Sequence, residues 1–410
     1  LDALGQAAKA TSLRADRNGM WRDAITPLRD AINAKEAMGQ DAGMAKTWVA
    51  GQMQRGYEVY GDHLYSGEAL KVPHVPAAYA EKAQPVDGRL VLRDNFKALF
   101  KRHPEAMVFG EDTGVIGDVN QGLEGMQEAF GETRVSDTGI REITIMGQGI
   151  GLAMRGLRPI AEIQYLDYLL YGMQILSDDC ATVRWRTAAG QQCPLIVRTR
   201  GHRLEGVWHS GSPMGMILGA LRGMIICTPR NMTQAAGMYN TLMQANEPAL
   251  VIECLNGYRL KEALPTNLGE FTVPLGQAEI LRQGDDITIL TYGSMCRLVM
   301  EAAQQLSDLD MEVEIVDAQT LMPFDIDGLA SASLAKTNRL LIVDEDVEGG
   351  ASAFLLKRVL EDQGGFMHLD IAPRTLTAKA HRPAYGSDGD YFSKPSVEDV
   401  VETVMEMLQN

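Results

Sequence analysis

The chain has 410 residues, enough for about two or three domains, and 45% of them are hydrophobic, which supports a sizeable core. Its net charge of −16 argues against nucleic acid and acidic membrane surfaces as partners. The five cysteines are scattered and show no metal-site spacing, which is typical of a reducing compartment. No apolar run approaches the roughly 18 residues of a membrane span, and no signal peptide is visible. We therefore expect a cytoplasmic protein, or one of the mitochondrial matrix if its source is eukaryotic.

Residues 1–88 are predicted to form a helical arm and a linker. Residues 1–53 carry apolar positions at loose helical spacing, with Pro27 as an expected interruption. From residue 57 to 89 the pattern gives way to glycine, proline and polar residues, which favours a linker over a domain. We find no motif for chemistry in this arm.

Residues 89–275 alternate between predicted strands and helices, which indicates a mostly parallel sheet with helices on both faces. Strands are predicted at 106–109, 160–165, 194–198, 224–228 and 249–254. Helices are predicted at 90–102, from Glu142 to about 156, and at 168–189, 213–221 and 231–245.

Residues 276–410 repeat this alternation on a smaller scale, after a connection at 264–276. Strands are predicted at 286–292, 312–317, 339–344 and 368–373, and helices at 296–308, 325–336, 350–362 and 396–409. The predicted fold class is therefore α/β, with two doubly wound domains and a helical N-terminal arm.

The stretch from 137 to 167 is unusually rich in glycine for a helix. Gly147 and Gly151 lie one helical turn apart, and small residues at that spacing let a second helix backbone approach closely. Glu142 stands at the start of this helix. The stretch predicts a site at a junction between chains, although tight packing within one subunit explains the glycines as well.

Ligands of open parallel sheets bind beyond the carboxyl ends of the strands. Three segments supply polar groups there: Glu111-Asp112, residues 138–142, and the loop that ends in His209. Each has a plain structural explanation, since acids are favoured at helix starts, strand ends are solvated, and serines beside His209 cap helices. Tyr165 and Tyr168 are explained as core aromatics.

The sequence gives little indication of other kinds of catalytic or binding site. The chain has no GxGxxG after a strand, no phosphate-loop GxxxxGK[ST] and no GxSxG nucleophile elbow. The turn at 291–294 joins a predicted strand to a helix, where either an anion or a simple N-cap accounts for it.

The order of segments resembles the beta subunit of thiamine-diphosphate-dependent 2-oxo-acid dehydrogenase first components, in the transketolase superfamily. The motifs that carry the resemblance are VFGED (108–112), DTGIRE (137–142), GLRPIAEIQYLDY (156–168), PLIVRTRG (194–201), WHSGSP (208–213), PALVIE (248–253), DITILTYGSM (286–295), VEIVDAQTLMPFD (313–325), LIVDEDVEGGASA (341–353) and PSVEDVVETVMEML (395–408). The resemblance covers about residues 89–410. It implies a pyrimidine-binding transketolase-like domain at 89–275 and a C-terminal transketolase-like domain at 276–410.

The resemblance also implies a cofactor site. Glu142 matches the family glutamate that hydrogen-bonds the aminopyrimidine ring of thiamine diphosphate and shares a proton with it. Tyr168 stands where the family has an aromatic residue against that ring, and Ile140 and Gln164 stand at further contact positions. Glu111 matches an acid in the buried channel between paired active sites.

His209 matches a histidine near the entrance for substrate and lipoyl group, and is expected to be catalytic together with Glu142. The family's motif for the diphosphate and Mg²⁺, GDG with Asn-Asn further along, is missing from this sequence, and three phosphate charges need a divalent cation and donors. We therefore expect no metal ligand in this chain, with Mg²⁺ held by a partner half.

The implied function is that of a beta-type half. It would decarboxylate a 2-oxo acid on thiamine diphosphate and pass the acyl group to the lipoyl-bearing acyltransferase component. The expected partners are an alpha-type subunit or N-terminal half, in a homodimer or an alpha2beta2-type assembly. One alternative is a transketolase or deoxyxylulose-phosphate-synthase-like transferase. Another is a non-catalytic assembly subunit, in which Glu142 is a helix-dipole acid and nothing more.

Overall fold

The computed structural model describes residues 20–61, 63–201, 212–382 and 389–409. The chain forms two compact units, residues 1–63 and residues 64–410. Within the described residues, no helix has the length and apolar character needed to cross a bilayer. The predicted domain bounds at 88 and 275 stay predictions.

The first unit is a pair of helices, α2 (Trp21–Ala37) and α3 (Gly43–Gly61). Its core is small and consists of Ile25, Ile32, Ala42 and Val49. The prediction that Pro27 interrupts the helix was wrong, because α2 continues through it. A proline removes a single N–H donor, and here that loss does not end a helix whose apolar side packs on α3.

The larger sheet of the second unit has seven strands in the order β12-β6-β7-β5-β4-β2-β3. Its strands are β2 (Ala106–Gly110), β3 (Val135–Asp137), β4 (Arg158–Glu162), β5 (Ile196–Gly201), β6 (Ile225–Cys227), β7 (Ala249–Cys254) and β12 (Thr320–Met322). All neighbouring strands are parallel except β12, which pairs antiparallel with β6. The strand β12 comes from the C-terminal half of the chain, so both halves build this sheet.

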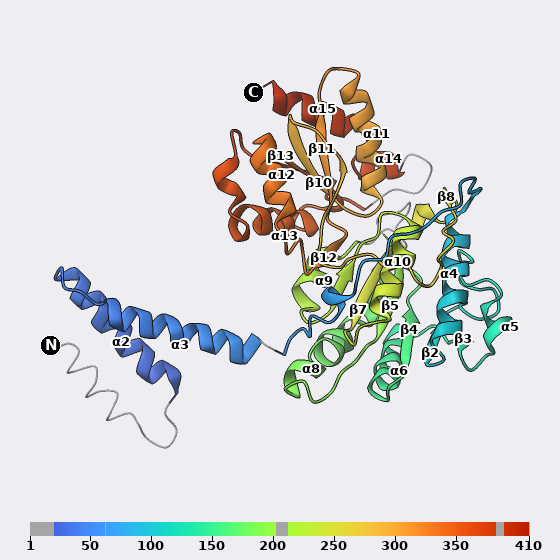
Figure 1. Ribbon diagram of the computed structural model, residues 1–410, viewed down its shortest axis with the longest axis horizontal. Coiled ribbons are helices and arrows are strands. Elements are labelled where there is room, and N and C mark those ends of the chain that lie inside the picture. The colour runs from blue at the N-terminus through green and yellow to red at the C-terminus, as the bar shows by residue number, and fades with distance from the viewer. Residues whose placement is uncertain (1–19, 62, 202–211, 383–388, 410) are drawn as a thin grey trace. The chain divides into compact units, whose positions relative to one another are not determined.

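Helices cover both faces of this sheet (Figure 1). Successive strand residues point to opposite faces, so Ile160 joins one apolar cluster and Ala161 the other. Helices α4 (Gly88–Arg102) and α10 (Met232–Leu242) pack on one face, and α6 (Glu142–Met154) and α9 (Met214–Ala220) pack on the other. A short helix, α5 (Met126–Phe130), follows β2.

The smaller sheet has the strand order β14-β13-β10-β11-β9, with only β9 antiparallel to its neighbour. Its strands are β9 (Glu279–Arg282), β10 (Ile287–Thr291), β11 (Val313–Asp317), β13 (Leu340–Val347) and β14 (Arg374–Ala378). Its helices are α11 (Met295–Ser307), α12 (Leu329–Thr337), α13 (Ala351–Lys357), α14 (Gly389–Ser393) and α15 (Val397–Leu408). The predicted α/β class with two doubly wound domains is therefore confirmed.

Two predicted elements were wrong. The expected long helix at 168–189 is a series of short turns, namely η2 (Leu166–Tyr171), α7 (Met173–Ile175), the π-helical η3 (Leu176–Cys180) and α8 (Val183–Arg186). A Cβ at Gly172 would lie 2.9 Å from Met146, so the chain passes too close to α6 there for a regular helix with side chains. The last strand of the smaller sheet is at 374–378 and not at 368–373, where a 3₁₀ turn, η6 (Gly365–His368), comes first.

Residues 64–84, which we call the strap, run across the connection between the two sheets. Val75 N donates to Thr272 Oγ1 at 2.8 Å, and Ala78 N donates to Asn267 Oδ1 at 2.9 Å. The strap then leads into β1 (Pro85–Asp87), which pairs antiparallel with β8 (Lys261–Ala263). These bonds make the strap an integral part of the larger unit.

Candidate active site

The structure brings five of the six predicted site residues into one pocket. The pocket measures about 640 Å³ and is lined by Glu111, Ile140, Arg141, Glu142, Gln164, Tyr165, Tyr168 and Tyr171. Its walls are the segments that follow β2, β3 and β4, which are adjacent parallel strands. The pocket therefore lies beyond the carboxyl ends of these strands, where open α/β sheets bind ligands.

Glu142 is the first residue of α6 and is only 9% exposed. A carboxylate at this position interacts favourably with the dipole of its helix. The Glu142 side chain is also buried in the pocket, and a carboxylate that only interacts with the helix dipole does not need to be buried. Glu142 can therefore present a carboxyl group to a ligand in the pocket.

Glu111 follows β2 and lies in the same pocket. Burial raises the pKa of Glu111, and the negative charges of Glu142, Asp112 and Glu162 raise it further. A Cβ at Gly110 would lie 2.8 Å from the Cβ of Glu162, so glycine is needed there for β2 and β4 to approach. A carboxyl group with a raised pKa beside a second one is suited to hold a proton.

Gln164 forms another part of the wall, just beyond β4. Its Nε2 donates to Asp112 Oδ2 at 3.0 Å. Asp112 has a φ of 56°, in the left-handed region of backbone conformation that residues other than glycine rarely adopt. This strained residue holds the Gln164 side chain at the pocket edge.

Three tyrosines supply the aromatic wall. The rings of Tyr168 and Tyr171 are stacked, with centroids 6.5 Å apart and an angle of 27°, and Tyr165 meets Tyr168 edge-on at 6.1 Å. Burial and the nearby Asp167 raise the pKa of Tyr168. Tyr171 is 66% exposed and extends this wall to the surface. The structure places these rings in a pocket wall, where a planar ring can pack against them.

The pocket fits one half of thiamine diphosphate. A buried acid, an amide side chain and aromatic rings suit an aminopyrimidine ring, which needs hydrogen-bond partners at its edge and an apolar surface at its face. For the diphosphate half the donor set is different, because Mg²⁺ requires several oxygen ligands. Within the described residues, no group of three or more His, Cys, Asp or Glu side chains could hold a metal ion.

His209 lies outside the described residues, so its predicted role stays a prediction. Sequence reasoning missed Arg141, Tyr165 and Tyr171 as lining residues, and it explained Tyr165 as a core aromatic. Tyr171 follows Tyr168 by three positions, and this spacing is the signal that could have pointed to it.

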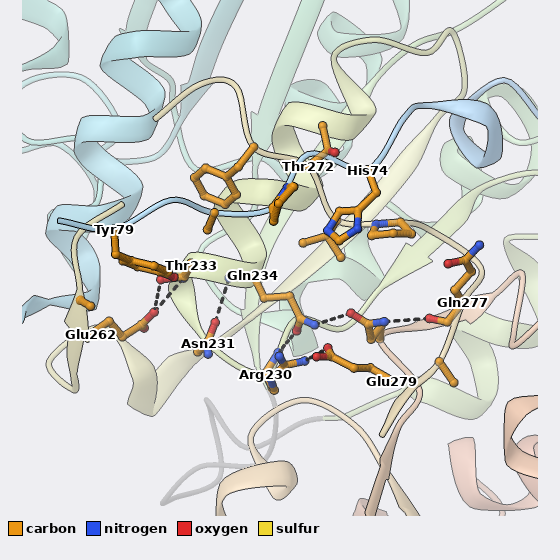
Figure 2. A pocket seen from close by; sticks show the side chains of 18 residues that line it. His74, Tyr79, Arg230, Asn231, Thr233, Gln234, Glu262, Thr272, Gln277 and Glu279 are labelled. Atoms are coloured by element: carbon orange, nitrogen blue, oxygen red, sulfur yellow. Dashed lines mark hydrogen bonds and ion pairs between the residues drawn. The ribbon is translucent and has the colours of Figure 1, made fainter. Parts of the chain in front are cut away.

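A second hollow of about 650 Å³ lies beside the strap and is lined by none of the predicted site residues (Figure 2). Several of its polar side chains are bonded to one another. Arg230 Nη1 donates to Glu279 Oε2 at 2.7 Å, and Thr233 Oγ1 donates to Glu262 Oε2 at 2.6 Å. These bonds join the start of α10 to β8 and the loop before α10 to β9, so we assign this hollow a structural role.

Comparison with known families finds two matches along the chain. Residues 84–259 match the model described as transketolase, pyrimidine binding domain, and residues 276–393 match transketolase, C-terminal domain. The five pocket residues that the sequence predicted all fall within the first match.

Two curated relatives are similar over most of their length. The 2-oxoisovalerate dehydrogenase subunit beta of Bacillus subtilis is 33% identical over 257 residues, covering 62% of this chain and 78% of that protein. The pyruvate dehydrogenase E1 component subunit beta of Staphylococcus aureus is 30% identical over 322 residues, covering 78% and 97%. Among solved structures, one described as a split gene transketolase, inactive beta4 tetramer, matches with a TM-score of 0.63 at 18% identity. It covers 79% of this chain and 99% of its own, and it shows the fold alone.

Proposed function

The chain belongs to the family of beta subunits of 2-oxo-acid dehydrogenase first components, and we propose that it acts as the beta-type half of such an enzyme. In this role it decarboxylates a 2-oxo acid with thiamine diphosphate and passes the acyl group to a lipoyl domain. The observation that carries the proposal is the gathering of Glu111, Ile140, Glu142, Gln164 and Tyr168 around one pocket.

Four residues of the pocket have a physical role in this proposal. Glu142 would share its proton with a ring nitrogen of the aminopyrimidine, and its burial keeps water from competing for that hydrogen bond. Tyr168 packs against the ring face, and Gln164 bonds the ring edge. Glu111 holds a proton close to Glu142. The bound cofactor supplies the carbanion and the electron sink.

A partner half is required because the pocket is incomplete. Its lining includes exposed large apolar side chains, Ile140 at 80% and Tyr171 at 66%. Exposed apolar groups around a polar pocket are typical of a surface that another chain covers. We propose that an alpha-type half covers these side chains and holds the diphosphate and Mg²⁺.

The strip formed by Gly147 and Gly151 on α6 supports the same interface. A Cβ at Gly151 would meet nothing within 4 Å, and one at Gly147 would make only an ordinary contact with Ile175. This chain therefore leaves the strip accessible to a helix of another subunit.

The proposal has three further parts: the role of His209, the acceptor of the acyl group and the compartment. His209 assists the 2-oxo acid or the lipoyl group, and a lipoyl-bearing acyltransferase component receives the acyl group. The protein works in the cytoplasm, or in the mitochondrial matrix if eukaryotic, a reducing setting that suits five buried free thiols.

Glu142→Gln tests the proposal. In the enzyme reconstituted with its alpha-type half, this change should abolish decarboxylation of pyruvate and branched 2-oxo acids while leaving the unfolding temperature nearly unchanged. Glu398→Gln is the matched control, because Glu398 is an exposed acid in the first turn of α15 and lies outside the pocket. A fully active Glu142→Gln enzyme would overturn the proposal and leave Glu142 as a helix-dipole acid. Activity with sugar phosphates alone would favour the transketolase-like alternative.

A further inference from the structure

Two arginines lie fully buried beneath the candidate site. Arg198 and Arg200 are two positions apart on β5, and neither side chain is exposed. Three carboxyl groups, of Asp118, Glu162 and Glu253, are buried with them. Burying these charges is energetically costly unless each one is closely paired with an opposite charge. The partners of each arginine therefore indicate its role in the structure.

The side chain of Arg198 forms hydrogen bonds to all three of these buried carboxyl groups. Its Nε and Nη2 donate to the two carboxylate oxygens of Glu253 at 2.8 and 3.0 Å, and its Nη1 donates to Asp118 Oδ2 at 2.8 Å. Nη1 also donates to Glu162. Among the described residues, the side chain of Arg198 donates no hydrogen bond to the main chain of the pocket wall. Its hydrogen bonds connect β5 to β4, to β7 and to the loop after β2.

Arg200 is different because its guanidinium reaches the pocket wall. Its Nη1 donates to the main-chain oxygen of Gln164 at 3.0 Å, and its Nη2 forms an ion pair with Glu162 Oε1 at 2.9 Å. Its Nε donates to the hydroxyl of Tyr258 at 3.1 Å. The planar fork of an arginine therefore fixes two points of the same short segment, one at the end of β4 and one two residues later.

The same pairing acts on the charges of the pocket. The carboxylate of Glu162 is one of the negative charges that raise the pKa of Glu111, after burial, Glu142 and Asp112. Arg200 carries a positive charge 2.9 Å from Glu162. It therefore offsets part of the negative potential behind Glu111.

We propose that Arg200 is a positioning residue of the cofactor pocket, which holds the segment from Glu162 to Gln164 in place through its ion pair with Glu162 and its hydrogen bond to the Gln164 carbonyl. This inference rests on the proposed function for its ligand, the pyrimidine half of thiamine diphosphate. The geometry itself concerns only this chain. Preorganised walls of this kind lower the cost of ordering a site when a ligand binds.

The test compares Arg200→Lys with Arg198→Lys. Both changes keep the charge and both disturb the buried cluster, but a lysine at 200 cannot bond Glu162 and the Gln164 carbonyl together. In the full chain without cofactor, hydrogen–deuterium exchange of peptides covering 163–168 should rise about tenfold in Arg200→Lys. Arg198→Lys should lower the unfolding temperature by at least as much and leave the exchange of this segment near the wild-type rate.

In the enzyme reconstituted with its alpha-type half, Arg200→Lys should raise the KM for thiamine diphosphate about tenfold, more than it lowers kcat. Tyr258→Phe is a second variant in case Arg200→Lys does not fold. It removes the hydroxyl that accepts from both Arg200 Nε and Arg198 Nη2 and keeps both guanidinium groups. It should raise exchange in 163–168 above the rate in Arg198→Lys.

Equal exchange of 163–168 in the two lysine variants, or wild-type exchange in Arg200→Lys, would overturn the inference and leave Arg200 as a structural residue. A wild-type enzyme that fails to bind thiamine diphosphate would instead contradict the proposed function. The exchange comparison would still decide whether Arg200 holds the segment.

Discussion

Glu247 accepts the main-chain N–H of Ala69 at 2.9 Å, although the two residues are 178 positions apart. The other carboxylate oxygen accepts the N–H groups of Ser66 and Gly67, each at 2.9 Å. One buried carboxylate thus satisfies three main-chain donors at the start of the strap.

Replacing Glu247 with alanine should destabilise the larger unit by about 3 kcal/mol, because three N–H groups lose a charged acceptor. Denaturant unfolding followed by tryptophan fluorescence measures this change. Proteolysis within residues 64–84 should also become faster. Glu270→Ala is the control, since Glu270 pairs with Arg102 at the surface and should contribute little. Equal stability of the two variants would contradict the role of Glu247.

Glu111→Gln should make the protein more stable at neutral pH. The pKa of Glu111 is raised above its usual 4.5 in the fold, so the folded state favours the protonated form. The stability that this group contributes is present below its unfolded pKa and is lost as the pH rises through the folded pKa. The variant keeps an uncharged side chain, so its unfolding temperature should exceed that of the wild type at pH 7 and match it near pH 4.

Glu105→Gln provides the opposite case at the other end of β2. Burial opposes ionisation of Glu105, but hydrogen bonds from its own backbone and from His103 lower its pKa overall. Its contribution is therefore present above the unfolded pKa and is lost as the pH falls through the folded pKa. Scanning calorimetry of both variants between pH 4 and pH 8 should show differences of opposite sign at pH 7, and a shared sign would contradict the pKa direction given for one of the two carboxyl groups.

Gly149 and Gly151 should respond differently to alanine, although both lie on α6. A Cβ at Gly151 meets nothing within 4 Å, so Gly151→Ala should gain about 1 kcal/mol of helix stability in the isolated chain. A Cβ at Gly149 would lie 2.7 Å from Leu195 Cδ1 and 3.4 Å from the Cβ of Ala161. Gly149→Ala should therefore be less stable than Gly151→Ala by about 2 kcal/mol in denaturant unfolding.

Gly151→Leu extends this test to assembly. If the strip on α6 receives a helix of the alpha-type half, leucine should block that approach and weaken the complex without unfolding the isolated chain. Analytical ultracentrifugation of mixtures with the alpha-type half measures the loss. Unchanged assembly would leave the strip as a feature of this chain alone.

The cysteines should resist modification while the protein is folded. All five are buried free thiols, and burial raises the pKa of Cys227 and Cys254 far above the usual range. Since the thiolate is the reactive form, iodoacetamide at pH 8 should label no cysteine until denaturant is added. Mass spectrometry counts the labels, and rapid labelling under native conditions would contradict this packing.

The sequence predicted most regular elements and most of the candidate site. The alternation of apolar and turn residues is strong in strands such as β5 and β7, which are buried on both faces. The position of Glu142 at a helix start was visible in the sequence, and its helix begins at that residue in the structure.

Other features were hidden because they depend on partners distant in the sequence. The helical pattern at 168–189 carries no sign of the close approach of Gly172 to Met146, which goes with the break in the helix. The strap has a linker composition, and its order comes from Glu247, Asn267 and Thr272 far along the chain. Arg200 reads as part of a strand, and its contact with the pocket wall appears only in three dimensions.

The strand β12 has a consequence for how the protein is made. It closes the edge of the larger sheet by pairing Thr320 with Cys227 and Met322 with Ile226. An N-terminal fragment that ends before residue 320 therefore leaves β6 as an open edge, which is a template for pairing with other chains. During synthesis the larger sheet stays unfinished until residue 322 has left the ribosome. A gene-level exchange of the C-terminal half between relatives must therefore carry a β12 that fits β6.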